Sequence, residues 1–272
     1  QYISTDYMQP DPRVNVTYAV HLTGGEAAAC NSSRVSRRCS GQAVEMISTA
    51  TERGYLAPLD RPDLTSILAA PPAPGSPRAI ADVAIFKTTR ELQGTPRWTL
   101  ATSDVTGEMF DHFADAVGAR LTRQAAPVLT ALLERAGDDR SVVSDAKTYF
   151  ATRRPYLHTD APICEPKSAH LANNPDYPSG HAAHGQHVAL ILAELIPQRK
   201  NQILTRGQEY AESRYVCGSH SYSAAEAGLH SAAAIYAAEH SSATFRRDME
   251  SARAEVAAAL TAATPASSPI FR

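Results

Sequence analysis

Two cations stand close together in the segment DAKTYFATRRPYLH, residues 145–158. Lys147 and Arg154 are seven positions apart, or two helical turns, and we predict a helix that ends where Pro155 follows Arg154. Both side chains would then lie on one helix face. Two cations on a buried face could clamp an anion, whereas on an exposed face they would only be hydrated.

A tightly specified turn precedes the next apolar segment. Ser179 can act as an N-cap, and Gly180 lacks a side chain that would keep another group away from the backbone. A helix N-terminus at this point offers unpaired N–H groups and a positive dipole end, which together favour anion binding. His181 would lie at the rim of such a site. The alternative is an ordinary cap followed by a surface histidine.

A third set of residues completes an inventory for phosphoryl transfer. Arg214 and His220 lie on either side of Gly218, which we expect to end a helix just before the histidine. Arginine binds phosphate oxygens in pairs, lysine supplies a point charge, and histidine can attack phosphorus or donate a proton near neutral pH. Phosphoryl transfer requires positioning groups and charge stabilisation of this kind.

Helical periodicity dominates the elements that must position these residues. We predict an all-α, single-domain helical bundle, because strand patterns are nearly absent and alanine is abundant. The predicted domains are an irregular N-terminal extension with a short helix (1–67), the helical domain (68–262) and a C-terminal tail (263–272). Residues 68–79 contain four prolines and should not form a regular helix. The predicted helices cover residues 79–92, 110–121, 126–139, 144–154, 188–196, 200–216 and 225–239.

Composition excludes several kinds of partner. Charged residues make up 20% of the chain and its formal net charge is -2, so no basic face indicates nucleic-acid binding. The longest apolar stretch, Val188 to Ile196, contains Glu194 and is too short to cross a bilayer, so we expect no membrane insertion. If the chain is exported, its signal peptide is absent from this sequence.

The four cysteines lack the CxxC spacing of zinc or thioredoxin sites. Cys30 and Cys39 flank a short basic loop, and Cys164 and Cys217 each lie beside a candidate functional segment. Two disulfides in an oxidising compartment fit this placement, as do four free thiols in a cytosolic protein.

As a set, the three segments resemble the signature of the class A bacterial non-specific acid phosphatases. That family belongs to the type 2 phosphatidic acid phosphatase and vanadium haloperoxidase superfamily. Lys147–Pro155 matches its first part, Pro178–His181 its second, and Ser213–His220 its third. The third part should end in aspartate, but Ala224 stands there. The similarity extends from about residue 68 to about residue 260.

The resemblance implies a phosphomonoesterase, with possible phosphotransfer to alcohols. His220 would be the nucleophile that forms a phosphohistidine, and His181 the general acid. The phosphoryl oxygens would be bound by Lys147, Arg154, Ser179, Gly180 and Arg214. Members of the family need no metal or other cofactor and act on small phosphorylated substrates. The resemblance therefore also implies a periplasmic or secreted protein and a homodimer. Because Arg154 and Arg214 would meet at one anion, we also predict a Cys164–Cys217 disulfide, with Cys30–Cys39 as a local one.

Ala224 cannot orient the nucleophile as the family's aspartate does, because it has no hydrogen-bond acceptor in its side chain. We therefore expect a substitute, with Glu226 as the candidate and Ser223 as another nearby group. Without a substitute, the chain would be a catalytically weak phosphate-binding protein. A vanadate-dependent haloperoxidase is a further alternative, because it shares the same anion cradle.

Overall fold

The computed structural model describes residues 18–20, 46–48 and 54–262. The chain divides into two compact units, residues 1–52 and 53–272. In the first unit, β1 (Tyr18–Val20) pairs antiparallel with β2 (Met46–Ser48). The second unit is built from helices in its described part, and the predicted all-α fold is confirmed. The boundary predicted at residues 67 and 68 stays a prediction.

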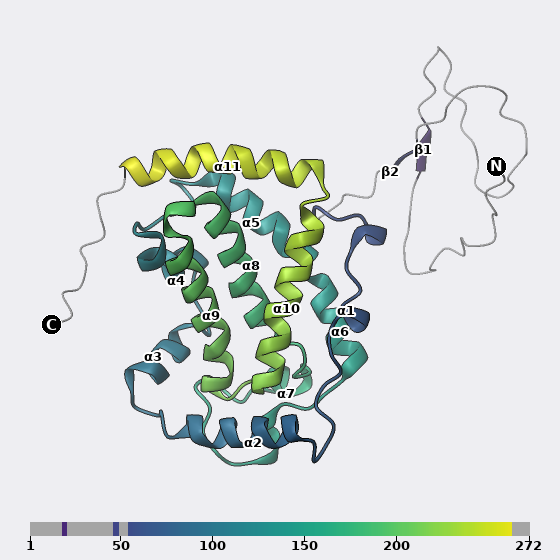
Figure 1. The fold of residues 1–272 in the computed structure, drawn as a ribbon, viewed down its shortest axis with the longest axis vertical. Coiled ribbons are helices and arrows are strands. Elements are labelled where there is room, and N and C mark those ends of the chain that lie inside the picture. Colours follow the sequence, from purple (N-terminus) through teal and green to yellow (C-terminus); the bar gives the residue numbers. More distant parts are fainter. Residues whose placement is uncertain (1–17, 21–45, 49–53, 263–272) are drawn as a thin grey trace, which may run out of the picture. The chain divides into compact units, whose positions relative to one another are not determined.

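Three long helices form the centre of the helical unit: α8 (Gly180–Leu195), α9 (Lys200–Cys217) and α10 (Tyr222–Glu239). Short connections make each antiparallel to the preceding one, and α8 contacts both of the others (Figure 1). Small residues let them approach closely. A Cβ on Gly207 would lie 2.4 Å from that of Ala189, and one on Gly228 only 2.6 Å from the carbonyl oxygen of Ser179.

The remaining helices surround this centre. In Figure 1, α11 (Ala243–Ala262) crosses one end of the three helices and α2 (Pro77–Arg90) crosses the other. The largest hydrophobic cluster joins α8 to α5 and α11. The other elements are η1 (Pro58–Asp60), α1 (Leu64–Ile67), α3 (Pro96–Ser103), α4 (Met109–Val117), α5 (Pro127–Asp139), α6 (Ser141–Phe150), η2 (Pro155–His158), α7 (Ala169–Asn173) and η3 (Pro197–Arg199).

One local prediction requires correction. The helix predicted over residues 144–154 ends at Phe150, because Ala151 adopts a left-handed conformation with φ 47°. By contrast, α9 ends at Gly218 and α8 begins after Ser179, as their capping residues predicted. Within residues 1–67 the structure has a short helix, α1. Within the described residues, no helix is both long and apolar enough to span a membrane.

The close approach of α10 to the start of α8 gives a testable prediction. Gly228→Ala should lower the free energy of unfolding by about 1–3 kcal/mol, because the added methyl group would overlap the carbonyl oxygen of Ser179 and the Cβ of Ala182. Thermal unfolding followed by circular dichroism measures this change. His230→Ala, on the exposed side of the same helix, is the matched control. An unchanged melting temperature for Gly228→Ala would contradict the packing described here.

Candidate active site

Three helix ends meet at one end of the central helices. The N-termini of α8 and α10 and the C-terminus of α9 lie at the end near α2 (Figure 1). Two helix N-termini bring two positive dipole ends to this place. Amides at the start of α10 already donate to the carboxylates of Asp176 and Asp82, so the start of α8 is the end that favours a further anion. The negative C-terminus of α9 is neutralised in part by Arg90, which donates to the carbonyl oxygen of Cys217 at 3.0 Å.

Ser179 forms the predicted N-cap of α8. Its hydroxyl accepts a hydrogen bond from the amide of Ala182 at 3.3 Å, and its own amide donates to the carbonyl oxygen of Ala224 at 2.9 Å. A methyl group on Gly180 would find only ordinary contacts, 3.8 Å from Cε of Lys147. Packing therefore does not require glycine at this position. The missing side chain leaves the first amides of the helix open toward Lys147.

Lys147 and Arg154 reach the same place from different segments. Lys147 lies on α6, whereas Arg154 precedes η2, so the prediction that both lie on one helix face is wrong. The ammonium group of Lys147 donates to the carbonyl oxygen of Pro175. The guanidinium of Arg154 donates to the carbonyl oxygens of Asn174 at 2.7 Å and Ser219 at 2.8 Å. These bonds hold the turn before α8 against the start of α10.

Arg214 lies on the last turn of α9 with only 1% of its surface exposed. One nitrogen, Nη2, donates to the carboxylate of Glu165 at 2.6 Å. Nε and Nη1 are buried and have no hydrogen-bond partner among the residues that the structure describes. Buried donors without partners destabilise a protein by about 1–3 kcal/mol each, so they indicate a missing acceptor such as an anion.

His220 has a defined orientation although Ala224 replaces the expected aspartate. Its Nδ1 lies 2.8 Å from the carboxylate of Asp176 and 2.8 Å from the carbonyl oxygen of the same residue. Both atoms are acceptors, so Nδ1 carries the proton and Nε2 the lone pair. Nη1 of Arg154 lies 3.1 Å from Nε2. Nε2 therefore accepts a hydrogen bond from this guanidinium, and a phosphoryl oxygen would have to take over that donor before Nε2 could attack.

Asp176, and not Glu226, is the group that orients His220. The carboxylate of Glu226 instead accepts a hydrogen bond of 3.4 Å from the hydroxyl of Tyr222. Asp176 lies in the turn before α8. Its carboxylate is anchored to the start of α10, because it accepts from the hydroxyl of Ser221 at 2.6 Å. Its amide donates to the carbonyl oxygen of Thr152 at 2.9 Å.

The protonation of the site follows from burial and from the neighbouring cations. Burial and the charges of Arg154 and Lys147 lower the pKa of His220 well below its usual value, which keeps the imidazole neutral in acid. Burial and the charge of Arg154 lower the pKa of Lys147 to about 7. Burial raises the pKa of Asp176 to about 6, although bonds from Ser221 oppose this shift. The neutral imidazole and the cationic lysine therefore coexist below about pH 7.

His181 lies half-buried on the first turn of α8, beside these groups. Its Nε2 lies 3.2 Å from the carbonyl oxygen of Val105, so Nε2 is the donor and Nδ1 remains for a second proton. Its ring is stacked on that of Tyr210, with 6.3 Å between the ring centroids. Burial and the charge of Arg214 lower the pKa of His181 to about 4, while Glu165 and the bond to Val105 oppose this shift.

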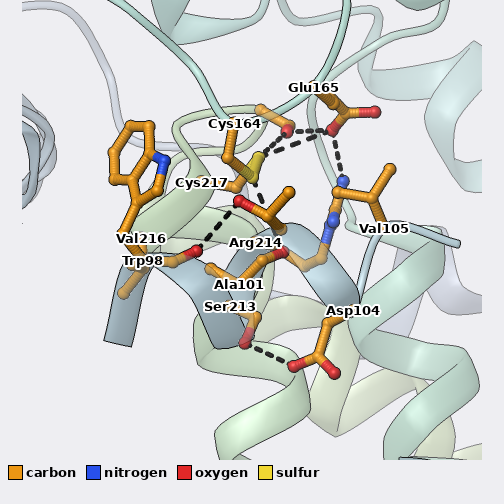
Figure 2. Close-up of a disulfide and its surroundings, with 12 residues drawn as sticks. Trp98, Ala101, Asp104, Val105, Cys164, Glu165, Ser213, Arg214, Val216 and Cys217 are labelled. Atoms are coloured by element: carbon orange, nitrogen blue, oxygen red, sulfur yellow. Dashed lines mark hydrogen bonds and ion pairs between the residues drawn. A yellow bond between two sulfur atoms is a disulfide. The ribbon is translucent and has the colours of Figure 1, made fainter. Parts of the chain in front are cut away.

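The predicted disulfide between Cys164 and Cys217 is present, with 4.8 Å between the Cα atoms. It connects the loop after η2 to the end of α9, three residues beyond Arg214. Figure 2 shows it beside the contact between Arg214 and Glu165. The predicted Cys30–Cys39 bridge lies outside the described residues.

Sequence reasoning missed Asp176 and Glu165. Asp176 stands two residues before the Pro178–His181 motif, so its closeness to that motif was the available signal. Glu165 follows a cysteine and gave no comparable signal.

Other polar residues of the motifs and helices make hydrogen bonds that stabilise the fold. Ser213 donates to Asp104 at 2.6 Å, and His187 pairs with Glu239 in the interior at 2.7 Å.

Metal ligands do not gather in the described part of the chain: no three His, Cys, Asp or Glu side chains there could share an ion. The site instead combines three cations, two helix N-termini and two histidines. Its chemistry is that of a site for a phosphoryl group, with a neutral imidazole beside the place where the anion would bind.

Comparisons with known proteins show the family of this chain. Residues 128–248 match the family model described as the PAP2 superfamily. An acid phosphatase of Zymomonas mobilis is 43% identical over 201 residues, which cover 72% of this chain and 76% of the relative. A non-specific acid phosphatase of Providencia stuartii is 32% identical over 219 residues, 78% of this chain and 88% of the relative. Another from Salmonella typhimurium is 31% identical over 196 residues, covering 68% and 78%. The chain belongs to the class A bacterial non-specific acid phosphatases of the PAP2 superfamily.

Proposed function

We propose that this phosphatase hydrolyses small phosphomonoesters through a covalent phosphohistidine on His220, without a metal ion. The observation that carries the proposal is the orientation of His220: Asp176 fixes the proton on Nδ1, and Nε2 lies 3.1 Å from Arg154. A neutral imidazole held in this way can act as a nucleophile. The unpartnered nitrogens of Arg214 support a phosphoryl site at the same place.

In the first step, Nε2 of His220 attacks phosphorus and the bond between phosphorus and the leaving oxygen breaks. Protonated His181 donates its Nδ1 proton to that oxygen, so the alcohol leaves neutral. A substrate dianion supports this role, because its charge favours the protonated form of His181. The phosphoryl oxygens and their developing charge are bound by Lys147, Arg154, Arg214, the Ser179 hydroxyl and the amide of Gly180.

In the second step, neutral His181 takes a proton from water, and the resulting nucleophile attacks the phosphohistidine. The bond between phosphorus and Nε2 breaks, phosphate forms, and His220 becomes neutral again. The positive charge of the phosphorylated imidazole favours the ionised form of Asp176, whose carboxylate accepts from Nδ1 and stabilises that charge. An alcohol in place of water would receive the phosphoryl group, so phosphotransfer is part of the proposal.

The weak, phosphate-binding alternative rested on the loss of the orienting carboxylate at Ala224. The carboxylate of Asp176 at Nδ1 supports the active phosphatase over that alternative. No separate observation favours a haloperoxidase. We also propose a periplasmic or secreted location, because the Cys164–Cys217 disulfide requires an oxidising compartment. A homodimer is proposed from the family resemblance alone.

The proposed function predicts that p-nitrophenyl phosphate is hydrolysed in the presence of EDTA. Orthovanadate should inhibit the reaction, because it mimics the trigonal-bipyramidal transition state and would bind the three cations. Release of p-nitrophenol measures both effects. Activity that disappears on chelation and returns with zinc or magnesium would contradict the metal-independent mechanism.

The orientation of His220 predicts a specific effect of Asp176→Asn. In a serine protease triad, the corresponding change of aspartate to asparagine lowers kcat by roughly 10⁴-fold. The carbonyl oxygen of Asp176 also accepts from Nδ1 here. We therefore expect a smaller loss in kcat, about 10²-fold to 10³-fold, with a smaller change in KM.

Steady-state kinetics with p-nitrophenyl phosphate measure this effect, and Glu226→Gln is the matched control. The control should leave kcat almost unchanged, because Glu226 contacts Tyr222 and not His220. Melting temperatures of both variants separate a loss of orientation from a loss of folding. A large effect of Glu226→Gln together with a normal Asp176→Asn enzyme would contradict the assignment.

A further inference from the structure

A second carboxylate lies inside the cationic site and has no part in the steps above. Glu165 accepts hydrogen bonds from Nη2 of Arg214 at 2.6 Å and from the hydroxyl of Ser219. Only 12% of its side chain is exposed. The carboxylate therefore binds the same arginine that the phosphoryl group requires, at a place largely closed to solvent.

The backbone around Glu165 is fixed to the end of α9. The preceding residue, Cys164, is bonded to Cys217, and its amide donates to the carbonyl oxygen of Cys217 at 3.1 Å. In Figure 2, Glu165 extends from this bridge toward the guanidinium of Arg214. A covalent bond and a main-chain hydrogen bond thus hold the carboxylate at Arg214, so a bound phosphate cannot easily displace it.

Glu165 keeps its negative charge in this position. Burial alone would raise its pKa, but the charge of Arg214 and the hydrogen bonds from Ser219 and Arg214 lower the pKa below its usual value. The carboxylate occupies one nitrogen of Arg214, and Nε and Nη1 remain without partners in the described chain. A phosphoryl group can therefore bind Arg214 while Glu165 stays in place, but the two anions repel each other.

We propose that Glu165 is a fixed counter-charge and positioning residue that holds Arg214 and weakens the binding of phosphate, so that product leaves the site. The inference rests on the proposed phosphatase function. Three cations and the N-terminus of α8 would otherwise bind the released phosphate dianion too firmly for turnover. Binding substrate and product more tightly gives no gain in kcat, whereas a fixed anion lowers the affinity for both.

Glu165→Gln separates this role from that of a simple anchor. Glutamine keeps an oxygen that can accept from Arg214 and Ser219, but it removes the charge. Inorganic phosphate should then bind more tightly, on the order of tenfold, because one repulsive charge near the anion is lost. KM should fall in the same direction, and kcat should fall if phosphate release limits turnover. If Glu165 only anchored Arg214, the glutamine variant would bind phosphate equally well or more weakly.

The pH profile gives a second readout. His181 is faced by Arg214, Arg154 and Glu165 from other segments, by His220 across the site, and by His184 on its own helix. Glu165 raises the pKa of His181. Removing this charge lowers that pKa, and His181 must be protonated to act as the acid. For an alkyl phosphomonoester, whose leaving oxygen must be protonated, the decline of kcat with rising pH should therefore move to lower pH in Glu165→Gln.

The experiment compares the wild type, Glu165→Gln and Glu165→Asp, with Glu91→Gln as a control for the loss of one exposed carboxylate. Titration calorimetry measures phosphate binding, and inhibition of p-nitrophenyl phosphate hydrolysis gives the inhibition constant for phosphate. Aspartate moves the carboxylate away from Arg214 by one methylene. Affinity for phosphate should rise from the wild type to the aspartate variant and again to the glutamine variant, while Glu91→Gln resembles the wild type.

Unchanged or weaker phosphate binding in Glu165→Gln, at a normal melting temperature, would overturn the proposal. If the glutamine variant does not fold, the aspartate variant decides: equal or weaker binding than in the wild type also overturns it. Calorimetry does not depend on turnover. A wild type that binds phosphate but hydrolyses no phosphomonoester would contradict the proposed function. The same titrations would still decide whether Glu165 weakens phosphate binding.

Discussion

The carboxylate of Asp176 is the interaction on which the rest of the site depends. It accepts hydrogen bonds from the hydroxyl of Ser221 at the start of α10 and from Nδ1 of His220. The amide of the same residue is held by Thr152, in the segment that leads to Arg154. One residue thus fixes the turn before α8, the start of α10 and the orientation of the candidate nucleophile. The cap at Ser179 and the close packing at Gly228 keep these helix ends together.

The site can bury many charged groups because carboxylates lie close to its cations and histidines. Lys147, Arg154 and Arg214 surround the proposed phosphoryl site. Glu165 accepts a hydrogen bond from Arg214, and Asp176 accepts one from His220. Burial and the same cations lower the pKa of His220, and the proposed attack on phosphorus uses the neutral imidazole. The charge of Lys147 is retained below about pH 7. Between about pH 6, where Asp176 ionises, and about pH 7, all three groups are therefore in the form that the proposed mechanism uses.

The sequence could predict the features that local patterns determine. The cap at Ser179, the end of α9 at Gly218 and the all-α class follow from capping rules and periodicity. The end of α6 did not follow, because Ala151 takes a left-handed conformation for which glycine is preferred. Asp176 could not be assigned either, because its contact with His220 joins residues 44 positions apart. A motif compared position by position finds Ala224 and the missing acid, but only the folded chain shows which carboxylate takes its place.

Trapping the phosphoenzyme tests the central claim, that His220 is the nucleophile, most directly. In His181→Ala, p-nitrophenyl phosphate should still phosphorylate His220, because p-nitrophenolate leaves without a general acid. Hydrolysis of the phosphoenzyme would then be slow, because the base that activates water is missing. With ³²P-labelled substrate and an alkaline quench, the account predicts a burst of p-nitrophenol and label on the peptide that contains His220. Label on another residue, or steady turnover without any labelled peptide, would contradict it.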